Sequence, residues 1–164
     1  IYQFGCLCRD NGIQLLYHNH DFEFVSFSGM YALDFLYAAM PEDVLKTEID
    51  VCWVKYAGED PAAYLRRYAG RAPVVHLKDF VGRKEGDAAP YGLLGQSETK
   101  AAGEVPFEFR PVGYGCQDVS AVAEAGLDAG ARWFVVEQDA SVGRTPLEAA
   151  AMSIDTLRRI GLKG

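Results

Sequence analysis

The stretch Pro73-Val74-Val75-His76-Leu77-Lys78-Asp79 joins a short apolar run to three polar side chains. The β-branched valines favour a buried strand that ends at His76. In α/β folds the carboxyl ends of the strands form the edge at which ligands bind. Taken alone, His76 is more often a core histidine held by a backbone carbonyl, with Lys78 and Asp79 solvated. The other strands of the chain therefore decide between the two interpretations.

Three further apolar runs in the chain also end in a side chain that offers a nitrogen or oxygen ligand atom. These are residues 13–17 before His18, 44–49 before Asp50, and 133–136 before Glu137. Segments with helical spacing or helix caps lie around and between the runs, and they cover residues 2–10, 30–40, 60–70, 117–129 and 145–162. Strict alternation of short strands and helices predicts a parallel sheet covered by helices, which is an α/β fold.

Residues 81–112 interrupt this alternation. The segment is rich in Gly, Ala, Lys and Glu and has no sustained hydrophobic period, so we interpret it as a long loop or insertion. Loops of this length in compact domains often act as lids, and we expect this one to cover the site. No linker divides the chain, so residues 1–164 are predicted to form a single domain.

The four predicted strand ends carry residues that bind divalent metals. Adjacent parallel strands end at the same edge of a sheet, so the side chains at these ends should converge there. They are His18, Asp50, His76 and Glu137. Two imidazoles and two carboxylates suit Mn²⁺, Co²⁺, Fe²⁺ or Zn²⁺ better than Ca²⁺. We predict a divalent metal site at this edge, with the identity of the ion, Mg²⁺ included, left open.

The composition excludes several classes of partner. A formal net charge of −7 argues against nucleic-acid binding, which requires clustered Lys and Arg. No apolar run is long enough to span a bilayer, and no signal-peptide pattern opens the chain. The four cysteines have no C-x-x-C spacing, so we expect free thiols in a reducing cytosol and a cytoplasmic protein.

Five short motifs, taken together, resemble the sugar phosphate isomerase/epimerase family of the xylose-isomerase-like TIM-barrel superfamily. They are YHNHDFEF at 17–24, EID at 48–50, VVHLKD at 74–79, PVGYG at 111–115 and VVEQD at 135–139. The likeness covers nearly the whole chain, but only as the C-terminal half of a (β/α)8 TIM barrel, strands five to eight. It implies a metal-dependent sugar (phosphate) isomerase or epimerase that acts through an enediolate intermediate.

The resemblance also implies roles for individual residues. In the superfamily a Glu, an Asp, a His and a second Glu hold the metal. Asp50, His76 and Glu137 match the last three, whereas His18 stands in place of the first Glu. Glu137 is the implied catalytic base. The expected contacts to the substrate are His20, Glu23, Trp53 and Arg110.

Several of these residues keep a second interpretation. Lys78 lies two residues after His76 and on the same side of the strand, so it is a second catalytic candidate that would bind a hydroxyl or an anion. Its alternative is a salt bridge to Asp50 or Asp139. Glu23 would restore the missing carboxylate, or it is an ordinary loop residue. Trp53 would stack on a sugar face, or it simply packs.

Two other functions stay open. The replacement of a carboxylate by His18 suits β-elimination from a keto-sugar or keto-inositol, as in inosose dehydratases or 3-keto-glycoside lyases. The other is a non-catalytic half-barrel for binding or assembly. Because four strands leave two unpaired edges, we expect a missing N-terminal half-barrel or a homo-oligomer to complete the fold. The start without Met, Ile1-Tyr2-Gln3-Phe4, leads us to expect part of a longer polypeptide.

Overall fold

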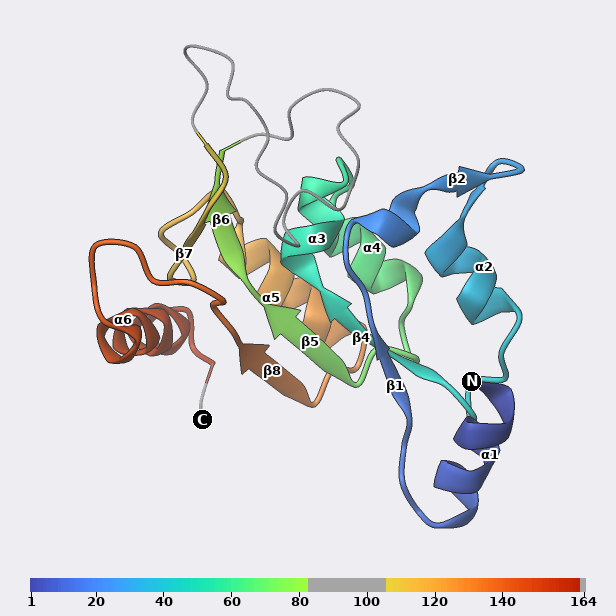
Figure 1. Cartoon of the computed structure of the whole chain (residues 1–164). Coiled ribbons are helices and arrows are strands. Elements are labelled where there is room, and N and C mark those ends of the chain that lie inside the picture. The colour runs from blue at the N-terminus through green and yellow to red at the C-terminus, as the bar shows by residue number, and fades with distance from the viewer. Residues whose placement is uncertain (83–105, 163–164) are drawn as a thin grey trace.

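A four-stranded parallel sheet forms the centre of the molecule (Figure 1). The structure, a computed structural model, describes residues 1–82 and 106–162. The strands follow the order β1 (Leu16–His18), β4 (Lys46–Asp50), β5 (Val74–Leu77) and β8 (Trp133–Val136). Each neighbouring pair is parallel. The predicted α/β class is therefore confirmed, and β8 has the predicted bounds.

Helices precede, connect and follow these strands. They are α1 (Tyr2–Asp10), α2 (Ala32–Ala38), α3 (Val51–Tyr56), α4 (Pro61–Arg67), α5 (Val119–Asp128) and α6 (Pro146–Arg159). In Figure 1, α3, α4 and α5 lie together on one side of the sheet. A 3-10 helix (Phe22–Phe24) and a small hairpin, β2 (Ser26–Phe27) and β3 (Met30–Tyr31), stand between β1 and α2. The sequence patterns predicted neither α3 nor this hairpin.

The hydrophobic core lies between the sheet and these helices. Side chains alternate between the two faces of a strand, so every second strand residue points at the helices. Ile49 of β4 and Val75 of β5 take that direction and are fully buried, as are Leu33, Val54 and Leu65 of the helices. The opposite face of the sheet remains open at β8, where Trp133 is 66% exposed and Val135 is 42% exposed.

Four of the six described helices, α3 to α6, begin at a side chain that accepts a hydrogen bond from a backbone amide of the first turn. Asp60 accepts hydrogen bonds from the amides of Ala62 and Ala63, and Pro61 occupies the first helical position. Thr145 and Glu148 form a capping box at the start of α6. These local signals place the helix starts because they require contacts with the nearest residues only.

The predicted loop over 81–112 is wrong at its two ends. Strand β6 (Asp79–Val81) pairs antiparallel with β7 (Glu108–Arg110) at the carboxyl end of β5. Phe80 of this β6–β7 ladder and Phe107 beside it pack against Trp53 and Tyr56, and this burial of aromatic surface stabilises the ladder. Residues 83–105, which include most of the proposed lid, lie outside the described residues.

The buried carboxylate of Asp79 organises the segment that follows β7. It accepts hydrogen bonds from the backbone amides of Phe80 and Gln117 through Oδ1, and from those of Gly113 and Gly115 through Oδ2. A Cβ atom on Gly115 would lie 2.2 Å from Asp79 Oδ1, so only glycine allows this approach. The glycines of the PVGYG motif therefore bring the backbone close to a side chain of the protein itself.

We expect Asp79→Ala to lower the free energy of unfolding by about 3–5 kcal/mol, because it removes the acceptor of four amides and leaves them unpaired. Urea denaturation followed by circular dichroism measures the change. Asp128→Ala is the matched control. Asp128 is exposed and pairs with Arg66 at the surface, so its loss should cost less than about 1 kcal/mol. Equal effects of the two substitutions would contradict this account of Asp79.

Candidate metal centre

Four side chains from the carboxyl ends of the four sheet strands gather at one point. Each offers one nitrogen or oxygen ligand atom, and these atoms all lie within 4.8 Å of one another. The residues are His18 at the end of β1, Asp50 at the end of β4, His76 in β5, and Glu137 directly after β8. Parallel pairing produces this arrangement, since Asp50 lies opposite His76 in the ladder between β4 and β5. The structure thus brings together the predicted set, and its role as a metal site stays a prediction.

Asp50 is the most constrained member of the group, and its side chain is fully buried. Its Oδ1 caps helix α3 by accepting from the amides of Cys52 and Trp53. Its Oδ2 faces the cluster, 3.1 Å from His18 Nε2. Asn19 pairs with the backbone N–H and carbonyl of Asp50, which ties the end of β1 to that of β4. One carboxylate therefore fixes the helix and presents an oxygen to the site.

His76 is a buried imidazole surrounded by carboxylate oxygens. Its Nε2 lies 2.7 Å from Glu137 Oε2, and its Nδ1 lies 3.6 Å from Asp50 Oδ2. Neither contact has hydrogen-bond geometry, so both ring nitrogens lack a hydrogen-bond partner among the described residues. Burial lowers the pKa of His76, against the opposing effect of Asp50, which favours the neutral ring that binds metals. Ring nitrogens without hydrogen-bond partners, close to carboxylate oxygens, are an arrangement that suits the binding of a divalent cation.

Lys78 neutralises part of this acidic cluster. Its ammonium is almost completely buried and lies 3.0 Å from Glu137 Oε2, 3.1 Å from Asp139 Oδ2 and 3.5 Å from Asp50 Oδ2. Burial alone would lower the pKa of Lys78, but the three carboxylates outweigh it and raise the pKa. The salt-bridge alternative for Lys78 is correct, and it involves both of the predicted aspartates.

The same contacts keep Glu137 ionised. Burial would raise the pKa of Glu137, but the hydrogen bond and charge of Lys78, followed by the charge of His76, lower it below its ordinary value. The Glu137 side chain is 44% exposed, so it is also the cluster member that a substrate can reach most easily. An accessible, ionised carboxylate can accept a proton.

A cavity of about 470 Å³ opens beside the cluster. Its lining includes charged groups, with Glu48, Lys78 and Asp139 next to His76 and Glu137. It also includes aromatic rings, those of His20, Phe22, Trp53 and Phe109. The volume is within the range typical of small-molecule sites. This cavity is the place where a substrate would meet the predicted ligands.

Two of the expected substrate contacts do not line the cavity. Glu23 is buried, and it accepts hydrogen bonds from the Tyr17 hydroxyl and the His20 amide. Arg110 pairs with Glu108 across 2.9 Å. Glu23 therefore shapes the loop after β1 and does not replace the carboxylate missing at His18. His20 and Trp53 do line the cavity, but Trp53 is only 4% exposed and mostly packs, with Phe107 stacked on it.

The sequence interpretation missed three acidic residues of the cavity as site residues, Asp21, Glu48 and Asp139. Glu48 lies two positions before Asp50 in β4, and Asp139 lies two positions after Glu137. Side chains two apart in a strand share one face, so the period of two was a usable signal for Glu48. Asp139 lies beyond the end of β8, where the period no longer holds.

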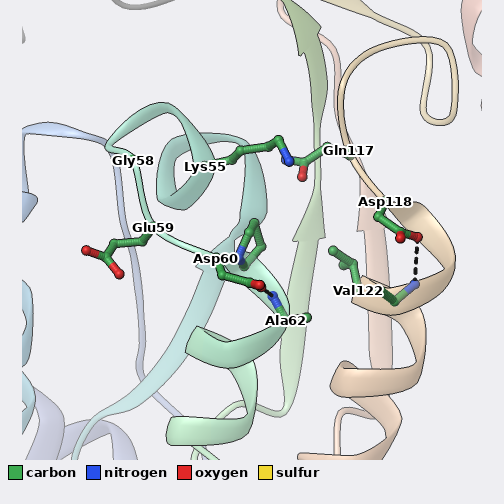
Figure 2. Close-up of a pocket in the computed structure, with 10 residues that line it drawn as sticks. Lys55, Gly58, Glu59, Asp60, Ala62, Gln117, Asp118 and Val122 are labelled. Carbon is green, nitrogen blue, oxygen red and sulfur yellow. Dashed lines mark hydrogen bonds between the residues drawn. The ribbon is translucent and has the colours of Figure 1, made fainter.

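A second cavity of about 450 Å³ lies between the α3–α4 connection and the start of α5 (Figure 2). Its acidic groups already have partners within the protein. Asp60 and Asp118 cap their own helices, and Glu59 accepts a hydrogen bond from the Tyr31 hydroxyl. This cavity therefore offers no free ligand set comparable with that at the strand ends.

Comparison with solved structures shows the same fold in larger proteins. A sugar phosphate isomerase/epimerase from Parabacteroides distasonis has a TM-score of 0.68 and 21% identity, over 94% of this chain and 48% of that chain. A xylose isomerase domain protein from Planctomyces limnophilus has a TM-score of 0.62 and 15% identity, over 96% and 51%. A xylose isomerase domain protein from Alicyclobacillus acidocaldarius has a TM-score of 0.63 and 16% identity, over 97% of this chain and 54% of that chain.

The chain thus spans about half the length of these TIM-barrel-family proteins, and the predicted half-barrel is confirmed at the level of the fold. No protein-family model and no curated protein matches the sequence. Among the described residues, no helix has both the length and the apolar character needed to cross a bilayer.

Proposed function

We propose that the strand-end cluster is the metal centre of a divalent-metal-dependent isomerase or epimerase that acts on a small sugar. The observation that carries this proposal is the convergence of two imidazoles and two carboxylates within 4.8 Å at the mouth of the sheet. This ligand set suits Mn²⁺, Co²⁺, Fe²⁺ or Zn²⁺, and Mg²⁺ remains a candidate. The names of the structural neighbours support the class of reaction.

Metal binding would be the role of the four clustered residues. His18, Asp50, His76 and Glu137 would hold the ion. When bound, a divalent ion polarises the carbonyl and hydroxyl oxygens of a sugar and stabilises the charge of the enediolate.

Glu137 is the proposed base that removes the proton beside the carbonyl, since it is ionised and accessible. Lys78, held between Glu137 and Asp139, is placed to bind a substrate oxygen once that oxygen enters the cavity.

Elimination from a keto-sugar or keto-inositol is the second candidate. An epimerase of this kind needs a base on each face of the reacting carbon, whereas elimination needs one base and one acid. The position of His18 favours this alternative, because it presents an imidazole where the resemblance expects a second carboxylate and Glu23 does not take that place.

Product analysis distinguishes these functions. The protein loaded with Mn²⁺ is incubated with a free ketose and, separately, with a 3-keto-glycoside, and the products are followed by NMR in D₂O. Epimerisation or isomerisation gives exchange at the carbon beside the carbonyl without loss of a group, whereas elimination releases the leaving group. Failure of both reactions, with metal bound, would favour the non-catalytic binding module.

We also propose that a complementary half-barrel completes this fold. Among the described strands, β1 and β8 each pair on one side only. The exposed apolar side chains of β8, Trp133 and Val135, need a cover, as do Phe4 and Leu7 of α1. Barrels of this type close with eight strands. The missing partner is therefore four further strands with their helices.

Without such a partner, the chain is expected to self-associate. Size-exclusion chromatography with light scattering measures its mass. Replacing Trp133 and Val135 with serine and threonine should reduce the association, whereas Phe35→Ser, which changes an exposed apolar residue on α2, should not. A cooperatively unfolding monomer of 18.0 kDa would contradict the proposal.

A further inference from the structure

The cavity beside the cluster has an excess of negative charge. Five carboxylates stand in or next to it, those of Asp21, Glu48, Asp50, Glu137 and Asp139. Among the described residues that line the cavity, Lys78 is the one lysine or arginine. A divalent ion at the proposed centre would still leave more negative than positive charge. A phosphate dianion entering this space would therefore meet net repulsion.

Lys78 is the cation of the cavity that could bind a phosphate, but its ammonium is already paired with carboxylates of the protein. Its ammonium contacts three carboxylates and lies 5.4 Å from the ring centre of Trp53 and 5.5 Å from that of Phe109. Of the three carboxylates, Asp139 is the one that is not a predicted metal ligand. Its carboxylate lies 3.1 Å from the ammonium and lines the cavity, so it occupies the position that an anionic ligand would take.

The aromatic residues that line the cavity suit an uncharged ligand. Phe22 and Phe109 present apolar surface, of the kind that packs against the C–H groups of sugars. Trp53 also lines the cavity, although only 4% of it is exposed. Aromatic surface of this kind does not require a charge on the ligand.

We propose, on the premise of the function stated above, that this cavity selects an uncharged sugar with a carbonyl group over its phosphorylated form, and that Asp139 determines this selectivity by neutralising Lys78. The inference names the substrate class of the site. It differs from what the names of the sugar phosphate isomerase/epimerase neighbours would suggest.

Matched pairs of ligands test the proposal. Binding of D-fructose and fructose 6-phosphate, D-xylulose and xylulose 5-phosphate, and D-ribulose and ribulose 5-phosphate is measured by calorimetry, with and without Mn²⁺. At least one neutral ketose should bind, and its phosphate should bind on the order of tenfold to a hundredfold more weakly. A phosphate that binds as tightly as its neutral partner, or no binding of any neutral ketose, would overturn the proposal.

Asp139→Asn identifies the residue responsible. It removes one negative charge and leaves Lys78 in contact with two carboxylates instead of three, so the ratio between neutral and phosphorylated affinities should fall by roughly tenfold. Asp155→Asn, on the exposed face of α6, is the control and should leave the ratio unchanged. An unchanged ratio in Asp139→Asn would overturn the role of Asp139. If the unsubstituted protein does not bind Mn²⁺, that result counts against the proposed function. The comparison of neutral and phosphorylated sugars without the ion still tests the selectivity of the cavity.

Discussion

Glu137→Gln is expected to lower the turnover number by a factor of about 10² to 10⁴ while the protein still binds its metal ion. The amide cannot accept the substrate proton at the position of the carboxylate, but its oxygen remains a ligand atom. Lys78 and His76 lower the pKa of Glu137, so the carboxylate is ionised at neutral pH and ready to act as the base. Steady-state kinetics and the exchange of the substrate proton in D₂O measure the loss.

Asp139→Asn provides the control for Glu137→Gln. It removes an equal charge next to Lys78 from the same cavity, but the residue lies outside the cluster of four. Turnover of a neutral substrate should fall less than about tenfold in this variant. Unchanged turnover in Glu137→Gln would show that another group removes the proton.

His76→Ala is expected to weaken metal binding by about 3–4 kcal/mol, which is two to three orders of magnitude in the dissociation constant. The substitution removes one of four ligands and leaves Asp50 and Glu137 facing each other without the imidazole between them. Calorimetric titration with Mn²⁺ and Zn²⁺ measures the change.

His20→Ala is the matched control for His76→Ala. His20 is also an imidazole at the edge of the cavity, with its ring 5.0 Å from that of His18, but it is not a member of the ligand group. Its removal should change the dissociation constant only a few-fold. Equal losses in the two variants would mean that the loss does not come from the removal of a metal ligand.

The strand ends were predictable from the sequence because they depend on local patterns. A run of β-branched and apolar residues marks each strand, and parallel pairing then brings the ends together. Trp133–Val136 shows this most clearly, since its apolar run coincides with the strand. The first strand was placed too early, because residues 13–15 are apolar in part but do not pair with β4, which begins its register at Leu16.

Elements that depend on distant contacts were not predictable. Four of the six residues of helix α3 are β-branched or aromatic, a composition that favours a strand, and its start is fixed by the Asp50 side chain. The β6–β7 pair joins Asp79 to Arg110 across a long gap in sequence. The same limit applies to Glu23, whose position is decided by the hydroxyl of Tyr17 on the preceding strand.

A titration with Co²⁺, followed by visible absorption, tests the central claim most directly, because the d–d bands of the ion report its ligands. The account predicts one ion per chain in a low-symmetry site with nitrogen and oxygen ligands, and loss of these bands in Asp50→Asn and His76→Ala. Absorption that stays at the level of hydrated Co²⁺ in the unsubstituted protein, or bands that survive both substitutions, would contradict it.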